Sequence, residues 1–157
     1  MIGWGTFIYF ACGAVALSVA ASAASLSGHR KAACLTSALS ALTIAGFICG
    51  LWITLGRPPL RTMGETRLWY SFFATIAGLF TYIRWKYRWI LSFSTVLSTV
   101  FILLNLLKPE IHDQTLMPAL QSLWFVPHVS VYMFSYSLLG CATLLSVVAL
   151  VRRSTDM

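Results

Sequence analysis

Long apolar runs separated by short charged groups are the feature that most limits how this chain can fold. The sequence is 59% hydrophobic and only 10% charged, whereas soluble domains carry about 25% charged residues. A helix of about 20 apolar residues spans the roughly 30 Å hydrocarbon core of a bilayer. We therefore expect one all-α membrane domain over residues 1–157, a polytopic bundle of about five transmembrane helices. The expected helices cover about residues 4–26, 33–55, 68–83, 89–107 and 128–151.

The first run shares one property with a cleavable signal peptide, the small residues at Ala21–Ser25. A signal peptide also carries positive charge before its apolar stretch. Residues Met1–Phe10 have none, and the first cations, Arg30 and Lys31, follow the run. We expect this run to be a retained helix.

Lysine and arginine are distributed unequally between the two sides of the expected bundle. Seven fall on one side, namely Arg30, Lys31, Arg84, Lys86, Arg88, Arg152 and Arg153. The other side has Arg57, Arg61, Arg67 and Lys108, beside Glu65, Glu110 and Asp113. The positive-inside rule then puts the N-terminus outside, the C-terminus inside, and loops 56–67 and 108–127 on the extracytoplasmic side. The net charge of +7 reflects this topology, and membrane-flanking groups of cations argue against nucleic-acid binding.

Several other patterns limit the chemistry. No expected span contains an internal Asp, Glu, Lys or Arg, which argues against ion-coupled transport. The four cysteines lie in apolar runs without a C-x-x-C pair, so we expect small apolar helix residues with no redox or metal role. Gly46-x-x-x-Gly50 matches the motif for close helix packing.

Three histidines are candidates for binding a metal: His29, His112 and His128. A transmembrane b-type haem needs two histidines at helix depth, and the expected spans contain no such pair. His29 lies in a cationic loop, and His112 lies between two acidic residues, so we expect both at the surface. The chain therefore does not match a respiratory haem-anchor subunit.

His128 stands at the expected start of the last helix, directly after Pro127, which suits a helix start. The preceding stretch, Leu116–Val126, is apolar, carries Trp124 and is too short to span a membrane, so we expect it in the interface. Tyr132 falls on the same helix face as His128, four residues on. A neutral imidazole here can bind a haem iron or serve as a structural residue at a helix end, and the residues alone leave both readings open.

Residues 116–140 resemble the CcsA-type (ResC-type) subunit of cytochrome c synthesis, in the haem-handling cytochrome c assembly family. The resemblance runs through Pro118-Ala119-Leu120-Gln121-Ser122, Trp124, His128-Val129-Ser130, Ser135-Tyr136 and Leu138. A second, looser similarity covers Gly56, Pro59-Leu60 and Glu65.

The resemblance implies that His128 is one of two extracytoplasmic axial ligands of haem b. It further implies a System II type role, in which haem is presented for thioether attachment to the C-x-x-C-H motif of apocytochrome c. Trp124 and Tyr132 are candidates for packing against the ring, and no residue is assigned a catalytic role. The implied location is the bacterial cytoplasmic (inner) membrane.

The family carries a Trp-rich segment and a second axial histidine after this region, and the sequence ends at Met157, where they would begin. We therefore expect other cytochrome c synthase subunits to supply them, with apocytochrome c and membrane lipid as further partners and no nucleic acid. The chain would be at most part of a haem lyase and inactive alone, whether it is half of a split protein, a truncation or a relic. The rival reading is a cofactor-free structural or scaffold subunit, and a permease subunit is a third.

Overall fold

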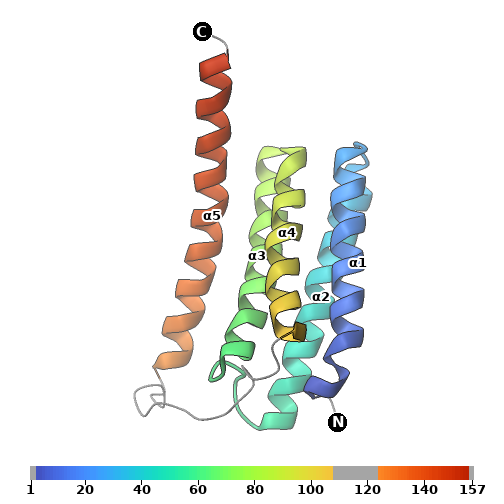
Figure 1. Cartoon of the computed structure of the whole chain (residues 1–157), viewed down its shortest axis with the longest axis vertical. Coiled ribbons are helices and arrows are strands. Elements are labelled where there is room, and N and C mark those ends of the chain that lie inside the picture. The colour runs from blue at the N-terminus through green and yellow to red at the C-terminus, as the bar shows by residue number, and fades with distance from the viewer. Residues whose placement is uncertain (1–2, 108–123, 156–157) are drawn as a thin grey trace.

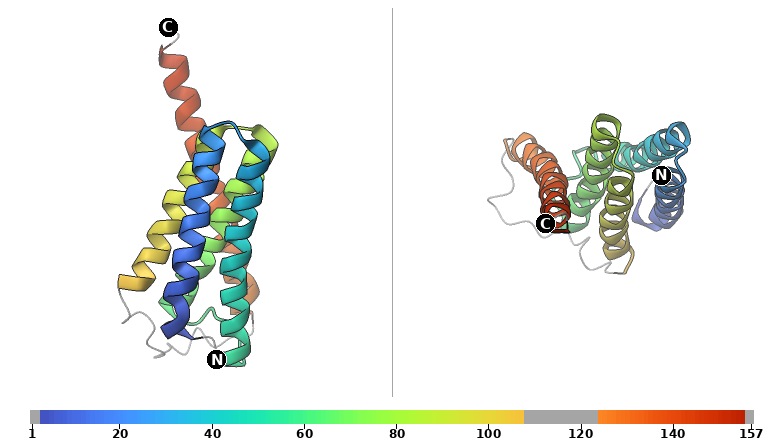
Figure 2. Two further views of the ribbon diagram at one scale, coloured as in Figure 1. Left: turned by 90° about the vertical axis from the view of Figure 1, so that its right-hand side faces the viewer. Right: turned by 90° about the horizontal axis from the view of Figure 1, so that it is seen from above.

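In a computed structural model of the chain, residues 3–107 and 124–155 can be described, and their regular structure is entirely helical. A short 3-10 helix, η1 (Trp4–Thr6), leads into the first of five α-helices. These are α1 (Phe7–Leu26), α2 (Arg30–Leu55), α3 (Met63–Trp85), α4 (Arg88–Leu107) and α5 (Phe125–Thr155). The helices run up and down side by side, with α5 at one edge of the bundle, reaching past the ends of the others (Figures 1 and 2).

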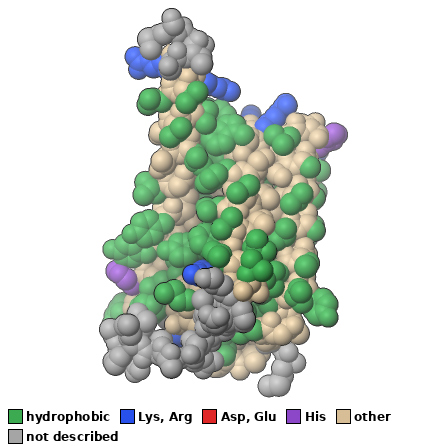
Figure 3. All heavy atoms as spheres, viewed as in Figure 1, with side chains coloured by type: hydrophobic (Ala, Val, Ile, Leu, Met, Phe, Trp, Pro, Cys, Tyr) green, Lys and Arg blue, Asp and Glu red, His purple; other side chains and the backbone are tan. Residues whose placement is uncertain are grey.

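The dimensions and composition of these helices suit a bilayer. Four stretches are long and apolar enough to cross one, namely Trp4–Leu26, Arg30–Leu55, Arg88–Leu107 and Pro127–Arg153. The more polar α3 has 23 residues, roughly 34 Å of helix, and packs against α2, α4 and α5. Hydrophobic side chains are spread over the sides of the molecule in Figure 3. The expected all-α polytopic bundle is confirmed.

Small side chains bring α1 and α2 together. Buried positions of α1 recur every three or four residues, at Ala11, Ala14, Ser18, Ala21 and Ser25. Because these side chains are short, the α2 backbone can approach closely. The hydroxyl of Ser40 on α2 donates to the Ala14 carbonyl at 2.8 Å and lies 2.7 Å from the hydroxyl of Ser18.

A second close approach joins α3 to α4. A Cβ added to Gly78 would overlap the side chain of Ser94. The Ser94 hydroxyl donates to the Ala74 carbonyl at 2.7 Å, and the Thr75 hydroxyl donates to Ser98 at 3.2 Å. Gly46, by contrast, is exposed, and a Cβ there would meet open space. Within the part of the chain that the structure describes, Gly46 of the Gly46-x-x-x-Gly50 motif therefore makes no close helix contact.

The start of α3 differs from the sequence-based expectation. The helix begins at Met63 rather than near Leu68, because Thr62 and Glu65 form a capping box that satisfies the free N–H groups of its first turn. Glu65 therefore belongs to a helix and not to the loop, and its side chain is only 1% exposed. Glu65 is in the first turn of α3 and outside the four candidate spans, so the expectation that no span contains an internal charged residue is unaffected.

Candidate functional site

The site predicted from the sequence lies at the end of the bundle where α5 begins. The connection between α2 and α3 lies at the same end, as does the N-terminus, whereas the C-terminal end of α5 lies at the opposite end (Figure 1). Of the segments that the charge pattern assigns to this side of the membrane, those that the structure describes thus lie at one end of the bundle.

His128 lies in the first turn of α5, which starts at Phe125. Its backbone N–H donates to the carbonyl of Trp124 at 3.3 Å. The imidazole is exposed, and its ring centroid lies 4.5 Å from that of Tyr132, with the planes at 61°. The expected placement of Tyr132 on the same face is therefore correct.

The aromatic residues beside His128 are also exposed. Trp124 is 81% exposed and Tyr132 is 48% exposed. Tyr136, one turn further, lies 5.8 Å from Tyr132 between ring centroids and is 54% exposed. An imidazole and two tyrosine rings thus form a continuous strip along one face of α5.

This face of α5 is open because the helix has few neighbours in the described residues. Only 11% of its membrane-spanning window is buried, against 28–39% for the other three candidate spans. Its main partner is α3, through contacts such as Phe73 with Phe134, whose ring centroids are 5.8 Å apart. The strip of His128, Tyr132 and Tyr136 is therefore accessible from outside the bundle.

Among the described residues, one histidine at the His128 end offers a nitrogen that suits one face of an iron porphyrin. His128 offers one nitrogen, whereas His29 precedes α2, at the opposite end of the bundle. His112 lies outside the described residues. No group of three or more His, Cys, Asp or Glu side chains suitable for a metal ion occurs in the described ranges. A second axial histidine for a haem iron at His128 would therefore come from outside these ranges.

A buried polar cluster stabilises the neighbouring connection from α2 to α3. The Glu65 carboxylate accepts two hydrogen bonds of 3.1 Å from the Arg57 guanidinium. It also accepts from the backbone N–H groups of Arg61 at 2.7 Å and Thr62 at 3.1 Å. The indole N–H of Trp69 donates to the Pro59 carbonyl at 2.8 Å. This cluster holds the connection in one conformation at the end of the bundle where α5 begins.

The sequence analysis did not predict which groups bind the Glu65 carboxylate. The Thr62-x-x-Glu65 spacing is the pattern of a capping box and could have indicated the helix start. The pairing of Arg57 with Glu65 has no comparable local signal, since it depends on how the chain turns around Pro58 and Pro59.

Cations are concentrated at the opposite end from His128. Arg30 and Lys31 begin α2, and the last turn of α5 contains Arg152 and Arg153. Arg84 lies in the last turn of α3, Lys86 in the turn that follows, and Arg88 begins α4. Figure 3 shows lysine and arginine side chains gathered at this end. The described cations at the His128 end are Arg57, Arg61 and Arg67, and Lys108 lies outside the described residues.

Comparison with known proteins points to a single family. The family described as "Cytochrome C assembly protein" matches residues 60–156 of the chain, a range that contains both Glu65 and His128. The chain is 36% identical over 121 residues to the cytochrome c biogenesis protein CcsA of Phalaenopsis aphrodite subsp. formosana, covering 73% of this chain and 37% of that protein.

Two further relatives carry the same name. The CcsA of Pelargonium hortorum is 38% identical over 112 residues, covering 69% of this chain and 35% of the relative. That of Oenothera argillicola is 34% identical over 113 residues, covering 70% and 35%. The chain thus spans about a third of the length of these curated relatives. No solved structure matches it.

Proposed function

The chain belongs to the cytochrome c assembly protein family, and from this premise we propose that it is a haem-binding membrane component of cytochrome c maturation. The observation that carries the proposal is the exposed imidazole of His128 at the start of an edge helix, inside the region matched by the family. The relatives are named for cytochrome c biogenesis, which supports the general role.

In this proposal His128 is an axial ligand of haem b, which is a substrate as well as a bound group. A neutral imidazole nitrogen is a common ligand of haem iron. The ring of Tyr132 lies edge to face with the imidazole, 4.5 Å away between centroids. Trp124 and Tyr132 would pack against the porphyrin, because exposed aromatic rings offer large flat apolar surfaces.

The chain's own residues would hold and orient haem at the end of the bundle. In thioether formation each apocytochrome c thiol adds across a haem vinyl group, so that a C–S bond forms and the thiol hydrogen goes to the other vinyl carbon. Among the described residues, His128 would provide one nitrogen to hold the iron. Other cytochrome c synthase subunits would supply the second axial histidine and a Trp-rich surface. The open face of α5 suits such a partner.

We further propose that the His128 end is extracytoplasmic. The cations concentrated at the opposite end support this orientation through the positive-inside rule. The proposed location is a bacterial cytoplasmic membrane. The long apolar helices support a multi-pass membrane protein, and the relatives named above come from plants.

The proposal is tested by measuring haem in the purified membrane complex. We expect a haem absorption spectrum whose intensity per mole of protein falls severalfold in His128→Ala. His29→Ala is the matched control, because it removes an exposed imidazole from the opposite end and should leave haem content unchanged. Equal haem content in wild type and His128→Ala would exclude His128 as a ligand. A wild-type complex free of haem would instead support the cofactor-free scaffold.

A further inference from the structure

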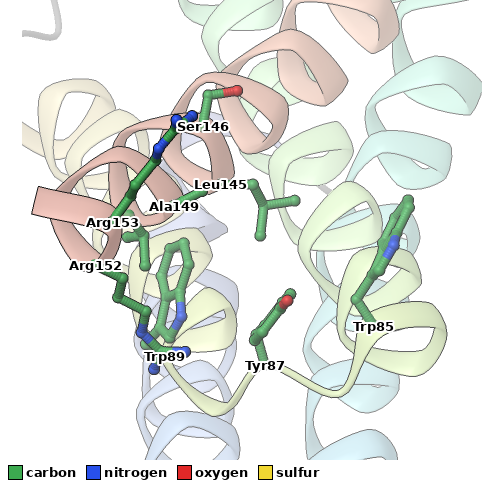
Figure 4. A pocket seen from close by; sticks show the side chains of 9 residues that line it. Trp85, Tyr87, Trp89, Leu145, Ser146, Ala149, Arg152 and Arg153 are labelled. Carbon is green, nitrogen blue, oxygen red and sulfur yellow. The ribbon is translucent and has the colours of Figure 1, made fainter. Parts of the chain in front are cut away.

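A cleft of about 750 Å³ opens at the end of the molecule opposite His128. One wall comes from the turn between α3 and α4 and the start of α4, and the other from the last turns of α5 (Figure 4). The residues on which the argument depends are Trp85, Tyr87 and Trp89 on the first wall, and Leu145, Arg152 and Arg153 on the second. The cleft is separate from the proposed haem site by the length of the bundle.

The first wall combines aromatic surface with a hydrogen-bond donor. Trp85 is 50% exposed and Tyr87 is 41% exposed. The indole N–H of Trp89 is buried and has no hydrogen-bond partner among the described residues. A buried donor without an acceptor is costly, so an acceptor oxygen bound in the cleft would remove this cost.

Positive charge lines one wall of the cleft, through Arg152 and Arg153. Further cations lie at the same end of the bundle, with Arg84 in the last turn of α3, Lys86 in the turn that follows and Arg88 at the start of α4. The cleft is therefore complementary to an anion.

The position of the cleft favours an anion that belongs to a lipid. The cleft lies beside Arg88, where the candidate span in α4 begins, and against the last turns of the α5 span, which ends at Arg153 and reaches beyond the other helices (Figure 1). Tryptophan, tyrosine and arginine at this level are typical of the headgroup region. The lining also includes apolar Leu145 and Val148, which suit the upper part of an acyl chain and offer nothing to a small free anion.

We propose that this cleft binds an anionic phospholipid. Its phosphate accepts hydrogen bonds from Arg152 and the indole N–H of Trp89, whose nitrogens lie on the same side of the cleft in Figure 4. Arg153 adds positive charge to the same wall, and the acyl chains lie against Leu145 and the apolar surface beside it. Basic pockets between transmembrane helices bind such headgroups in the same way. The bound lipid would fill the cleft between α5 and the α3–α4 turn and so connect the edge helix to the bundle.

Native mass spectrometry of the full protein, with any copurifying partners, tests the proposal. The protein is released from bilayers of phosphatidylglycerol and phosphatidylcholine. We expect selective retention of phosphatidylglycerol, about tenfold lower in R152Q/R153Q than in R30Q/K31Q, since direct charged hydrogen bonds add to the general surface attraction. The R30Q/K31Q pair is the matched control because it removes two cations from the same end but outside the cleft lining.

Three results would overturn the proposal. Equal losses in the two double variants would show that only diffuse surface charge attracts the lipid. Equal retention of the two lipids by the wild type would show that the cleft has no preference for an anion. Displacement of phosphatidylglycerol by millimolar inorganic phosphate would show that the cleft recognises a free anion.

Fluorescence quenching gives a second test, which does not depend on the folding of the arginine variants because it compares the wild type with W85F/W89F. Phosphatidylglycerol brominated near the top of its acyl chains should quench tryptophan fluorescence more than equally brominated phosphatidylcholine. This excess should disappear in W85F/W89F, although four of the six tryptophans remain. An excess that persists in W85F/W89F would place the lipid elsewhere and refute the site.

Discussion

Arg57 and Glu65 are joined by two hydrogen bonds of 3.1 Å across the connection between α2 and α3. The Glu65 side chain is 1% exposed and that of Arg57 is 19% exposed. The same carboxylate accepts from two backbone N–H groups, while the Thr62 hydroxyl accepts from the N–H of Glu65 at 3.1 Å. The Glu65 side chain thus caps the start of α3, accepts hydrogen bonds from the backbone of the α2–α3 connection and neutralises the partly buried Arg57.

Replacing Glu65 by alanine should destabilise the protein more than most single changes. The change leaves the Arg57 guanidinium and two backbone donors without their acceptor, which should cost about 2–4 kcal/mol. Thermal unfolding in nanodiscs would show a clearly lower midpoint. Arg61→Gln is the control, because the Arg61 side chain is exposed and its loss should cost no more than about 0.5 kcal/mol. Equal midpoints for the two variants would contradict a stabilising role of this ion pair.

Gly78→Ala should separate α3 from α4. Its new methyl group would overlap the side chain of Ser94, which is held by a hydrogen bond to Ala74. Overpacking of this kind costs about 1–3 kcal/mol. Gly46→Ala offers a comparison within a helix, since its methyl group meets open space and alanine favours helix by about 1 kcal/mol over glycine. Thermal unfolding midpoints should move in opposite directions, and a shared direction would refute the close approach at Gly78.

A hydrogen bond from the Asn105 side chain joins the end of α4 to the start of α3, and we expect it to stabilise the protein. The side-chain amide of Asn105 donates to the Gly64 carbonyl at 3.0 Å, and the residue is 1% exposed. Asn105→Ala should lower the free energy of unfolding by about 1 kcal/mol. Asn105→Asp should cost more, because a buried carboxylate would face the carbonyl oxygen in place of the donor. Chemical denaturation of both variants checks this order, and an aspartate variant as stable as the alanine variant would contradict it.

Cysteine labelling tests the orientation of the bundle. Cys12, Cys34, Cys49 and Cys141 are free thiols and are first replaced by alanine or serine. A membrane-impermeant maleimide should then label Arg61→Cys in intact cells, and should label Lys31→Cys only after the membrane is disrupted. Both positions are exposed and lie at opposite ends of the bundle. The reverse pattern would place His128 on the cytoplasmic side and exclude the proposed haem presentation.

Much of the architecture could be predicted from local patterns in the sequence. Apolar runs of about 20 residues predict helices that cross a bilayer, since every backbone polar group there needs a partner within the segment. The grouping of cations at one end follows from the order of runs and loops. The four-residue spacing correctly placed Tyr132 beside His128, because helical periodicity is a local property. The resemblance at residues 116–140 likewise led to the correct family.

Only the tertiary structure decided which helix faces meet and which loop residues become buried. Transmembrane helices that are apolar on most sides carry little information about their rotation. The contact of Gly78 with Ser94 and the exposure of Gly46 therefore had to be seen in the fold. The pairing of Arg57 with Glu65 depends on the path of the chain between two helices, which no local pattern specifies. The cleft between Trp89 and Arg152 exists only because α5 stands beside the α3–α4 turn, and residues so far apart in the sequence become neighbours through helix packing alone.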